Sequence, residues 1–348
     1  MEFYDWNRTF AYSTARWVIV ISARRYGKTY GLRKQCVRDY IKRGRRFVEV
    51  CRHKTEVPII GEAYFTRLQE NNEFPGYEFK YEKSQLFIRK IAPEGREKPW
   101  EVIGYVLALT DEQILKRLTF TKVKRFIFDE GLIEHKDRYK RYLPREFERL
   151  KGLCMSVTGE TPENPSDAVV YILGNAVDLT APVFPACGIK KLPGFGRHLY
   201  HSDIGDVLLD YVEPQYYEEF ASKTTFGRAL SATDEGEKLL KNVFEGSNMD
   251  YVEAKPSNAK FWRGYRYSGQ TFALWFTDTL CYVTEKAPRN ARLRVFTLDD
   301  DTINYDIIRR SGDDAKIIRR LMLYKYFRYE SPLLREKFLD MITQLSFI

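Results

Sequence analysis

The stretch Arg16-Trp17-Val18-Ile19-Val20-Ile21-Ser22-Ala23-Arg24-Arg25-Tyr26-Gly27-Lys28-Thr29 decides the fold. Its nearly continuous β-branched run over residues 16–21 predicts a buried strand of a parallel sheet. After a turn, the apolar spacing predicts a helix from Lys28 to about Lys42 that ends at Gly44. A second strand at residues 47–51 completes a β-α-β unit, so we predict an α/β fold.

The turn after the first strand matches most of the GxxxxGK[ST] pattern of a phosphate-binding P-loop. Gly27-Lys28-Thr29 fits the pattern, and Ser22 stands where its first glycine belongs. In a P-loop the backbone N–H groups surround the phosphates, the lysine contacts the β- and γ-phosphate oxygens, and the Ser or Thr hydroxyl binds Mg²⁺. We therefore predict ATP and Mg²⁺ as cofactors. The residues expected to contact the nucleotide are Ser22, Ala23, Arg24, Arg25, Tyr26, Gly27, Lys28 and Thr29.

A later apolar strand ends in two adjacent carboxylates, within Phe126-Ile127-Phe128-Asp129-Glu130. An Asp at such a strand end commonly holds Mg²⁺, and an adjacent Glu can orient and deprotonate the attacking water. Asp129 is therefore a predicted metal ligand beside Thr29, and Glu130 is the predicted catalytic base. Asn175 ends a further strand and is a candidate sensor of the γ-phosphate, although an ordinary turn asparagine explains it equally well. We predict an additional-strand P-loop ATPase, in which an extra strand lies between the two motifs.

Composition limits the class of protein and its partners. Charged residues are 30% and apolar residues 44% of the 348 residues, which is typical of a globular chain long enough for two domains. The net charge of +9 favours a polyanionic partner, nucleic acid or an acidic membrane, unless it merely marks a basic soluble protein. Five cysteines without a CxxC pair suit a reducing cytoplasm. No apolar run is long enough for a transmembrane helix, so we expect no membrane partner.

Proline and glycine predict where the domains divide. Both are frequent in residues 176–200, so we predict that the P-loop ATPase domain spans residues 1–200. The polar residues 201–255 predict a helical linker. A smaller α+β domain is predicted over residues 256–348.

Further elements follow from alternation and amphipathic spacing. In the first domain a β-hairpin leaves the core, and a short helix and one more strand follow. In the second domain three strands form a meander before two closing helices. The predicted ranges are strands at 77–81, 86–90, 102–109, 169–173, 261–267, 271–277 and 280–283, and helices at 111–118, 313–328 and 332–345.

Five segments carry a resemblance to a known family, in the same order and with similar spacing over residues 1–185. They are Phe3-Tyr4-Asp5-Trp6-Asn7, the Ala23–Thr29 loop, Val50-Cys51-Arg52-His53-Lys54, Phe126–Glu130 and Gly174-Asn175-Ala176-Val177. As a set they resemble the genome-packaging ATPases of small protein-primed podophages, the phi-twenty-nine-like group, which is related more distantly to large terminases. The second half of the chain is similar more weakly, through the meander and the closing helices.

The resemblance implies a homo-oligomeric ring, a pentamer, at the portal of a procapsid in the host cytoplasm. The ring would pump double-stranded DNA, and the resemblance leaves open whether a scaffold RNA is needed. It also implies that the C-terminal domain has an RNase H-like fold without nuclease activity. A two-metal nuclease needs convergent carboxylates. The middles of the predicted strands lack them and carry Tyr265, Tyr267, Ala273 and Trp275.

The resemblance also implies roles for single residues. Lys28, Thr29, Asp129, Glu130 and Arg24 match the family's nucleotide site directly. Lys116 matches a lysine offered to the neighbouring subunit's nucleotide, and Lys54 and Lys136 match positions that face DNA in the pore. Arg52 is the candidate switch that holds Glu130 inactive until DNA binds. The family's arginine finger has no counterpart in residues 150–189, so Arg145 or Arg149 serves instead, or Lys116 acts alone.

Three other interpretations remain open at this point. One is a helicase or AAA-type remodeller, which would unwind DNA without a capsid. Another is a non-catalytic module whose degenerate P-loop only binds nucleic acid, which Ser22 would favour. The last is a terminase with an active nuclease, for which Asp278 and Asp299–Asp301 are the nearest carboxylates.

Overall fold

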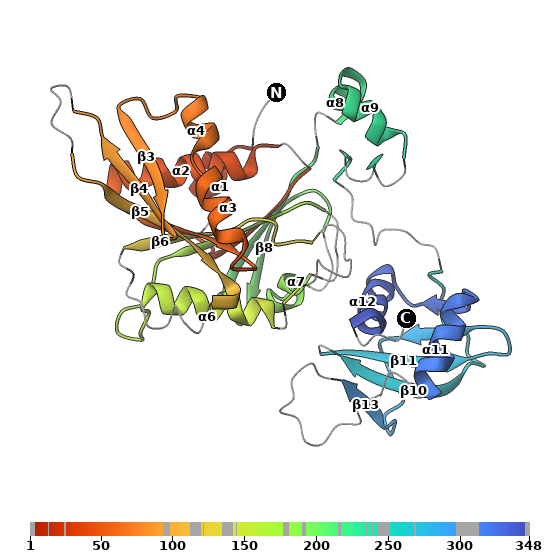
Figure 1. Cartoon of the computed structure of the whole chain (residues 1–348). Coiled ribbons are helices and arrows are strands. Elements are labelled where there is room, and N and C mark those ends of the chain that lie inside the picture. Colours follow the sequence, from red (N-terminus) through yellow and green to blue (C-terminus); the bar gives the residue numbers. More distant parts are fainter. Residues whose placement is uncertain are drawn as a thin grey trace. The chain divides into compact units, whose positions relative to one another are not determined.

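The computed structural model is shown in Figure 1. It describes residues 4–12, 14–23, 26–92, 98–111, 120, 122–133, 142–143, 145–176, 181–189, 193–214, 217–233, 236–237, 240–242, 251–267, 269–296 and 313–344. These residues form two compact units, one reaching residue 242 and the other starting at residue 251. Each unit has its own sheet and its own hydrophobic core.

The N-terminal unit is built on a nine-stranded sheet with the order β3-β4-β5-β2-β6-β7-β1-β9-β8. Its central strands are parallel: β1 (Trp17–Ile21), β2 (Arg46–Cys51), β5 (Glu101–Ala108), β6 (Val123–Phe128), β7 (Val169–Gly174) and β9 (Gly205–Tyr211). Antiparallel strands complete both edges: β3 (Tyr77–Glu82), β4 (Gln85–Lys90) and β8 (Gly196–Ser202). The predicted parallel α/β sheet and the β3–β4 hairpin are confirmed.

The order of the central strands confirms the additional-strand class. Strand β7 lies between β1, which precedes the P-loop, and β6, which precedes the Asp129-Glu130 pair. All three strands run in the same direction, so the segments that follow them leave the sheet at one edge. This is the edge at which open α/β sheets bind their ligands.

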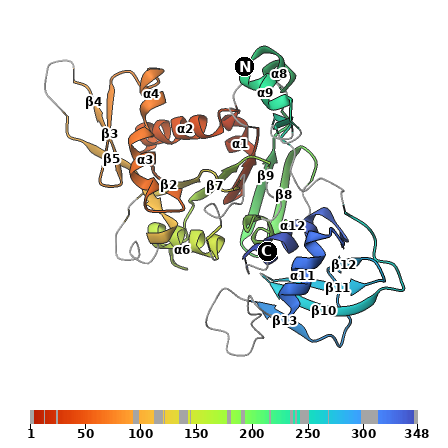
Figure 2. The ribbon, with the colours of Figure 1, turned by 45° about the vertical axis from the view of Figure 1, so that its right-hand side comes forward.

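Helices cover both faces of this sheet (Figures 1 and 2). One face carries α1 (Trp6–Tyr12), α2 (Lys28–Arg43), α3 (Glu56–Ala63) and α4 (Thr66–Glu70), and the other carries α6 (Glu146–Thr158) and α7 (Val183–Ala186). Helix α2 buries Leu32, Cys36 and Val37 in the core. It ends at Gly44, as predicted, where a left-handed φ of 66° suits glycine.

The predicted end of the ATPase domain at residue 200 is wrong. Strand β8 crosses this boundary and β9 lies beyond it, yet β9 pairs with β1 inside the chain's first sheet, between β1 and the edge strand β8. Val207 and Leu209 of β9 are fully buried. The residues that were expected to begin a helical linker are therefore core, and the Pro- and Gly-rich segment is a connection inside the domain around α7. Helices appear only later, as α8 (Tyr217–Lys223) and α9 (Thr225–Ser231).

The C-terminal unit contains a five-stranded sheet with the order β13-β10-β11-β12-β14. Strands β10 (Lys260–Tyr267), β11 (Gln270–Phe276) and β12 (Cys281–Thr284) form the predicted antiparallel meander. Strands β13 (Leu293–Phe296) and β14 (Phe327–Tyr329) flank it, each parallel to its neighbour. Helices α11 (Asp313–Leu323) and α12 (Pro332–Gln344) supply Ile318 and Phe338 to its core.

The first of the two closing helices is shorter than predicted. It ends at Leu323, and residues 327–329 form a strand that pairs with β12. Lys325 adopts a left-handed φ of 57°, which breaks the helical path before the strand. Phe327 and Tyr329 are then buried in the core of this unit. Their burial in a strand outweighs the amphipathic spacing that predicted a continued helix.

No candidate nuclease site lies within the described part of the C-terminal unit. Nowhere in the described residues do three His, Cys, Asp or Glu side chains come close enough to hold a metal ion. The buried carboxylate of Asp314 instead accepts a hydrogen bond of 2.9 Å from the Tyr265 hydroxyl. Asp299–Asp301 lie outside the described residues, as does the helix predicted over 111–118 except for its first residue. The RNase H-like identity of this α+β unit stays a prediction.

Two expectations from composition can be compared with the structure. All five cysteines are buried and free of disulfides. Among the helices of the described residues, none combines the length and apolar character needed to cross a membrane.

The position of β9 predicts how the chain tolerates truncation. A chain ending at residue 243 keeps the whole first sheet and should fold, whereas one ending at residue 200 loses β9 and exposes an edge of β1. We expect cooperative thermal unfolding by circular dichroism only for the longer chain. Cooperative unfolding of the shorter chain would contradict the assignment of β9 to this core.

Candidate nucleotide site

The P-loop connects β1 to α2, and its described residues have the geometry of a phosphate site. Gly27 caps α2 in a left-handed conformation, with φ of 76° and ψ of 13°, which glycine adopts without steric cost. No side chain accepts a hydrogen bond from the first N–H groups of α2. Such N–H groups at a helix N-terminus can donate to a phosphate. At the other end of the loop, Ser22 is fully buried, and its N–H donates to the Gly174 carbonyl over 3.2 Å. Arg24 and Arg25 lie outside the described residues.

The lysine of the P-loop is hydrogen-bonded to Asn175, the predicted sensor of the γ-phosphate. Lys28 Nζ donates a hydrogen bond of 2.7 Å to Asn175 Oδ1, across 147 residues of sequence. Asn175 directly follows β7, so the contact results from the pairing of β1 with β7. The structure thus brings these two predicted residues together, which an ordinary turn asparagine would not require.

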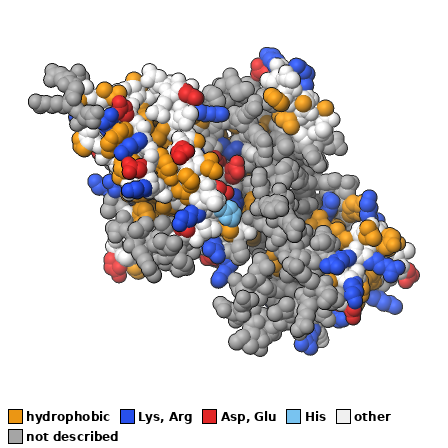
Figure 3. All heavy atoms as spheres, in the orientation of Figure 1, with side chains coloured by type: hydrophobic (Ala, Val, Ile, Leu, Met, Phe, Trp, Pro, Cys, Tyr) orange, Lys and Arg blue, Asp and Glu red, His pale blue; other side chains and the backbone are white. Residues whose placement is uncertain are grey.

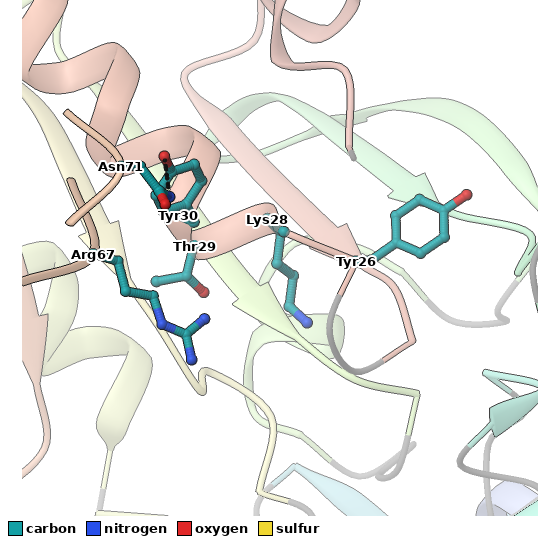
Figure 4. A pocket seen from close by; sticks show the side chains of 7 residues that line it. Tyr26, Lys28, Thr29, Tyr30, Arg67 and Asn71 are labelled. Carbon is teal, nitrogen blue, oxygen red and sulfur yellow. Dashed lines mark hydrogen bonds between the residues drawn. The ribbon is translucent and has the colours of Figure 1, made fainter. Parts of the chain in front are cut away.

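A cavity of about 580 Å³ opens beside the P-loop. Its lining consists of Tyr26, Gly27, Lys28, Thr29, Tyr30, Arg67 and Asn71. Figure 4 shows the Thr29 hydroxyl and the Arg67 guanidinium pointing toward one another, with Lys28 directed to the same space. Tyr26 lies on the far side of Lys28 and points away from Thr29. Arg67 and Asn71 come from α4 and the residues just after it, and nothing in the sequence pattern singled them out.

The Asp129-Glu130 pair forms a turn at the end of β6. Glu130 is exposed and has a left-handed φ of 51°, which is uncommon for a residue other than glycine. Its N–H donates to Asp129 Oδ1 over 3.0 Å. The next residue, Gly131, donates to the Leu173 carbonyl, and a Cβ there would lie 2.4 Å from Ile172. Close contact with β7 therefore fixes this turn, and sparsely populated backbone conformations of this kind gather at functional sites.

Arg52 contacts the main chain of this turn, and its predicted switch role stays a prediction. Its guanidinium donates to the main-chain carbonyls of Glu130 (2.7 Å) and Gly131 (3.1 Å). Its Nε and Nη2 also donate to the buried Glu146 carboxylate, over 2.8 and 2.9 Å. Arg52 therefore holds the backbone of Glu130, and its paired guanidinium is not bonded to the Glu130 side chain. Glu146 begins α6, and the sequence offered no sign of this partnership.

The aromatic N-terminal segment supports the P-loop from outside. Trp6 Nε1 donates to the Lys28 carbonyl over 2.8 Å, and the Tyr4 N–H donates to the Tyr26 carbonyl over 2.9 Å. Trp6 also packs on Gly31, where a Cβ would lie only 2.6 Å from its ring. Glycine is thus required at position 31, because the Trp6 ring lies too close for a Cβ. The N-terminal segment that carries part of the family resemblance therefore has a structural role beside the P-loop.

A buried ion pair lies beneath the same region. Arg33 of α2 donates through Nε to Glu49 of β2 over 2.9 Å, and its guanidinium lies over the Tyr64 ring. Burial raises the pKa of the Glu49 carboxyl, and the Arg33 charge opposes that shift. This pair joins the P-loop helix to the strand next to β6, and neither residue stood out in the sequence.

A buried asparagine ties together the strand ends that flank the P-loop. Asn242 donates to the Val212 carbonyl, and its Oδ1 accepts the Ala176 N–H over 3.2 Å. Its Nδ2 also approaches the Ile21 carbonyl. These carbonyls and the N–H belong to the ends of β9, β1 and β7. Asn242 fell in the predicted linker, so its role depends entirely on tertiary structure.

The residues predicted to act on DNA or on a neighbouring subunit are only partly described. Lys54 is exposed, with its ammonium 3.8 Å from Asp111. Arg145 is exposed just before α6, and Arg149 is half-buried on that helix. Lys116 and Lys136 lie outside the described residues. On the face seen in Figure 3, Lys and Arg are mixed with acidic side chains on the N-terminal unit and predominate among the charged side chains of the C-terminal unit.

Comparison with known proteins shows which chains this one is similar to. The chain is 29% identical to the DNA packaging protein of Bacillus phage B103 over 285 residues, 81% of each chain. It is 26% identical to the DNA packaging protein of Bacillus phage phi29 over 321 residues, 91% of this chain and 90% of that one.

A solved structure agrees with the fold. A chain of the bacteriophage phi29 viral genome packaging motor assembly superposes with a TM-score of 0.71 at 23% identity, covering 99% of this chain and all of that one. The sequence profile of the family described as Podovirus DNA encapsidation protein (Gp16) matches residues 2–341. The chain therefore belongs to the Podovirus DNA encapsidation protein (Gp16) family.

Proposed function

We propose that this chain is the ATPase subunit of a motor that moves double-stranded DNA into a procapsid. The strand order β6-β7-β1 carries the proposal, because it places Lys28, Asn175 and the Asp129-Glu130 turn at one edge of the sheet. The names of the relatives, DNA packaging proteins of Bacillus phages, support DNA as the substrate that is moved.

The P-loop fits the triphosphate of ATP. Its left-handed Gly27, the helix start without a side-chain cap and the Lys28 ammonium supply N–H donors and positive charge at one place. Thr29 and Asp129 are the residues that would hold Mg²⁺. When bound, Mg²⁺ would neutralise phosphate charge and polarise the phosphate oxygens.

Glu130 is the proposed base for hydrolysis. It accepts a proton from water as the water oxygen bonds to the γ-phosphorus and the bond from that phosphorus to the ADP oxygen breaks. Asn175, bonded to Lys28 before nucleotide arrives, would release the ammonium to the phosphates and contact the γ-phosphate itself. Arg52 keeps the Glu130 turn in place through the main chain.

The remaining roles concern neighbours and DNA. Arg145 or Arg149, on the same segment as Glu146, or Lys116 would reach the nucleotide of the adjacent subunit in a ring, a pentamer at the portal vertex in the host cytoplasm. Lys54 and Lys136 would contact DNA phosphates in the pore. Phosphate contacts carry no sequence information, so this binding should be nonspecific and sensitive to salt.

Replacing the P-loop lysine tests the motor directly. We expect Lys28→Ala to lower ATP turnover by about 100-fold or more, because it removes the charge on the phosphates. Packaging into purified procapsids should stop, while Lys42→Ala, an exposed lysine at the other end of α2, should package normally. A Lys28→Ala chain that packages DNA would remove the motor assignment. Unwinding of forked DNA by the wild type without procapsids would favour a helicase instead.

The role of Glu130 separates binding from turnover. Glu130→Gln keeps the shape of the side chain but removes the base, so ATP should still bind while hydrolysis falls by about 100- to 10,000-fold. Fluorescent ATP binding and phosphate release measure the two steps. Hydrolysis at the wild-type rate would exclude Glu130 as the base.

The Arg52–Glu146 pair predicts a loss of both stability and turnover. Glu146→Ala leaves the mostly buried Arg52 charge without its partner, which should lower the free energy of unfolding by about 3 kcal/mol or more. Turnover should fall as well, because Arg52 would no longer be fixed by Glu146 and could not hold the Glu130 turn in place. Glu148→Ala, an exposed residue on the same helix paired with Lys151, is the matched control and should change stability by about 1 kcal/mol or less. Equal melting of the two variants in denaturant titrations would contradict this role.

A further inference from the structure

The cavity beside the P-loop contains a second cation besides Lys28. Arg67 lines it from α4, and Figure 4 shows its guanidinium facing the Thr29 hydroxyl. None of the seven lining residues is acidic. The cavity therefore presents two positive side chains to whatever fills it, which suits an anion.

Arg67 differs from the nearby Lys34 in its ion pairing. No carboxylate of the described residues forms an ion pair with its guanidinium, whereas the nearby Lys34 is paired with Glu73. The Arg67 side chain is exposed, so its charge remains available to a ligand. Arg67 is also planar and able to donate two parallel hydrogen bonds, the geometry that phosphate oxygens accept.

The backbone that carries Arg67 is fixed to the P-loop helix. Asn71, just after α4, donates through Nδ2 to the Tyr30 hydroxyl over 2.9 Å, and that hydroxyl donates to Glu73. Lys34 of α2 completes the network by its ion pair with Glu73. The position of α4 over the P-loop is thereby set by polar contacts with α2 itself.

Buried side chains hold α4 from its other side. Leu68 of α4 and the adjacent Phe65 are almost fully buried, and Phe65 stacks on Phe79 with ring centroids 4.6 Å apart. Arg67 therefore extends from a short helix that is anchored on two sides. The backbone that carries Arg67 is thus already ordered, and binding costs only the freedom of the Arg67 side chain.

We propose that Arg67 contacts the γ-phosphate of ATP bound in its own subunit. The inference rests on the proposed function and extends it. Thr29 is the P-loop residue that would hold Mg²⁺ beside the phosphates, and Arg67 faces Thr29 and not Tyr26. An arginine supplied from the same subunit would add a charge at the transferred phosphoryl group, where negative charge is redistributed during hydrolysis.

Equilibrium binding to the full-length chain tests the proposal. The probes are a fluorescent non-hydrolysable ATP analogue and fluorescent ADP, each with Mg²⁺. Arg67→Ala should weaken binding of the ATP analogue by about 10- to 100-fold, the usual effect of one charge-assisted bond, and binding of ADP by less than about threefold. Arg67→Lys should restore part of the loss, because it returns the charge without the planar fork.

Controls separate this inference from the function on which it rests. Lys90→Ala removes an exposed cation of β4 outside the cavity lining and should bind both nucleotides like the wild type. Thermal melting verifies that each variant is folded. Unchanged binding of the ATP analogue by Arg67→Ala, or an equal loss for ADP, would overturn the γ-phosphate contact alone. Failure of the wild type to bind ATP, or binding unaffected by Lys28→Ala, would overturn the nucleotide site itself.

Discussion

Parallel pairing of β1 with β7 on one side and β9 on the other fixes where the candidate nucleotide site lies. The pairing places the P-loop between two neighbouring strand ends, next to Asn175, and makes the Lys28–Asn175 bond possible. It also leaves β6 only one strand further away, so the carboxylates of Asp129 and Glu130 emerge at the same edge. Any slip in this register would move the whole site, because every member is attached to a strand end.

Main-chain contacts, and not side-chain pairing alone, hold the Asp129-Glu130 turn. Glu130 occupies a backbone conformation that costs about 1–3 kcal/mol for a residue other than glycine. The Arg52 bonds to two carbonyls and the close packing of Gly131 on β7 oppose that cost. Arg52 in turn depends on Glu146, so α6 on one face of the sheet is linked to a turn at its edge. A movement of α6 can thus be transmitted to the proposed base.

Support for the phosphate loop comes from three parts of the chain that are distant in sequence. Trp6 holds it from the N-terminus, α4 is attached to it through Tyr30 and Asn71, and Asn242 joins the strand ends on either side. These contacts hold the described residues on either side of the loop, and a fixed geometry of the groups around a phosphate favours phosphoryl transfer. The same contacts place Arg67 at the cavity beside the P-loop.

The sequence by itself determined the β-α-β unit, the P-loop and the Asp129-Glu130 strand, since these depend on local periodicity and on short motifs whose chemistry is fixed by residue type. It also predicted most strands and the meander of the second unit. It misplaced the domain boundary, because Pro and Gly mark any surface connection, and only pairing with β1 reveals that β9 is core. Arg67, Glu146 and Asn242 were likewise beyond it. Glu146 and Asn242 bond to partners distant along the chain, and Arg67 lines the cavity from a helix other than the P-loop helix. Such contacts depend on burial and geometry that arise only when the sheet and its helices have assembled.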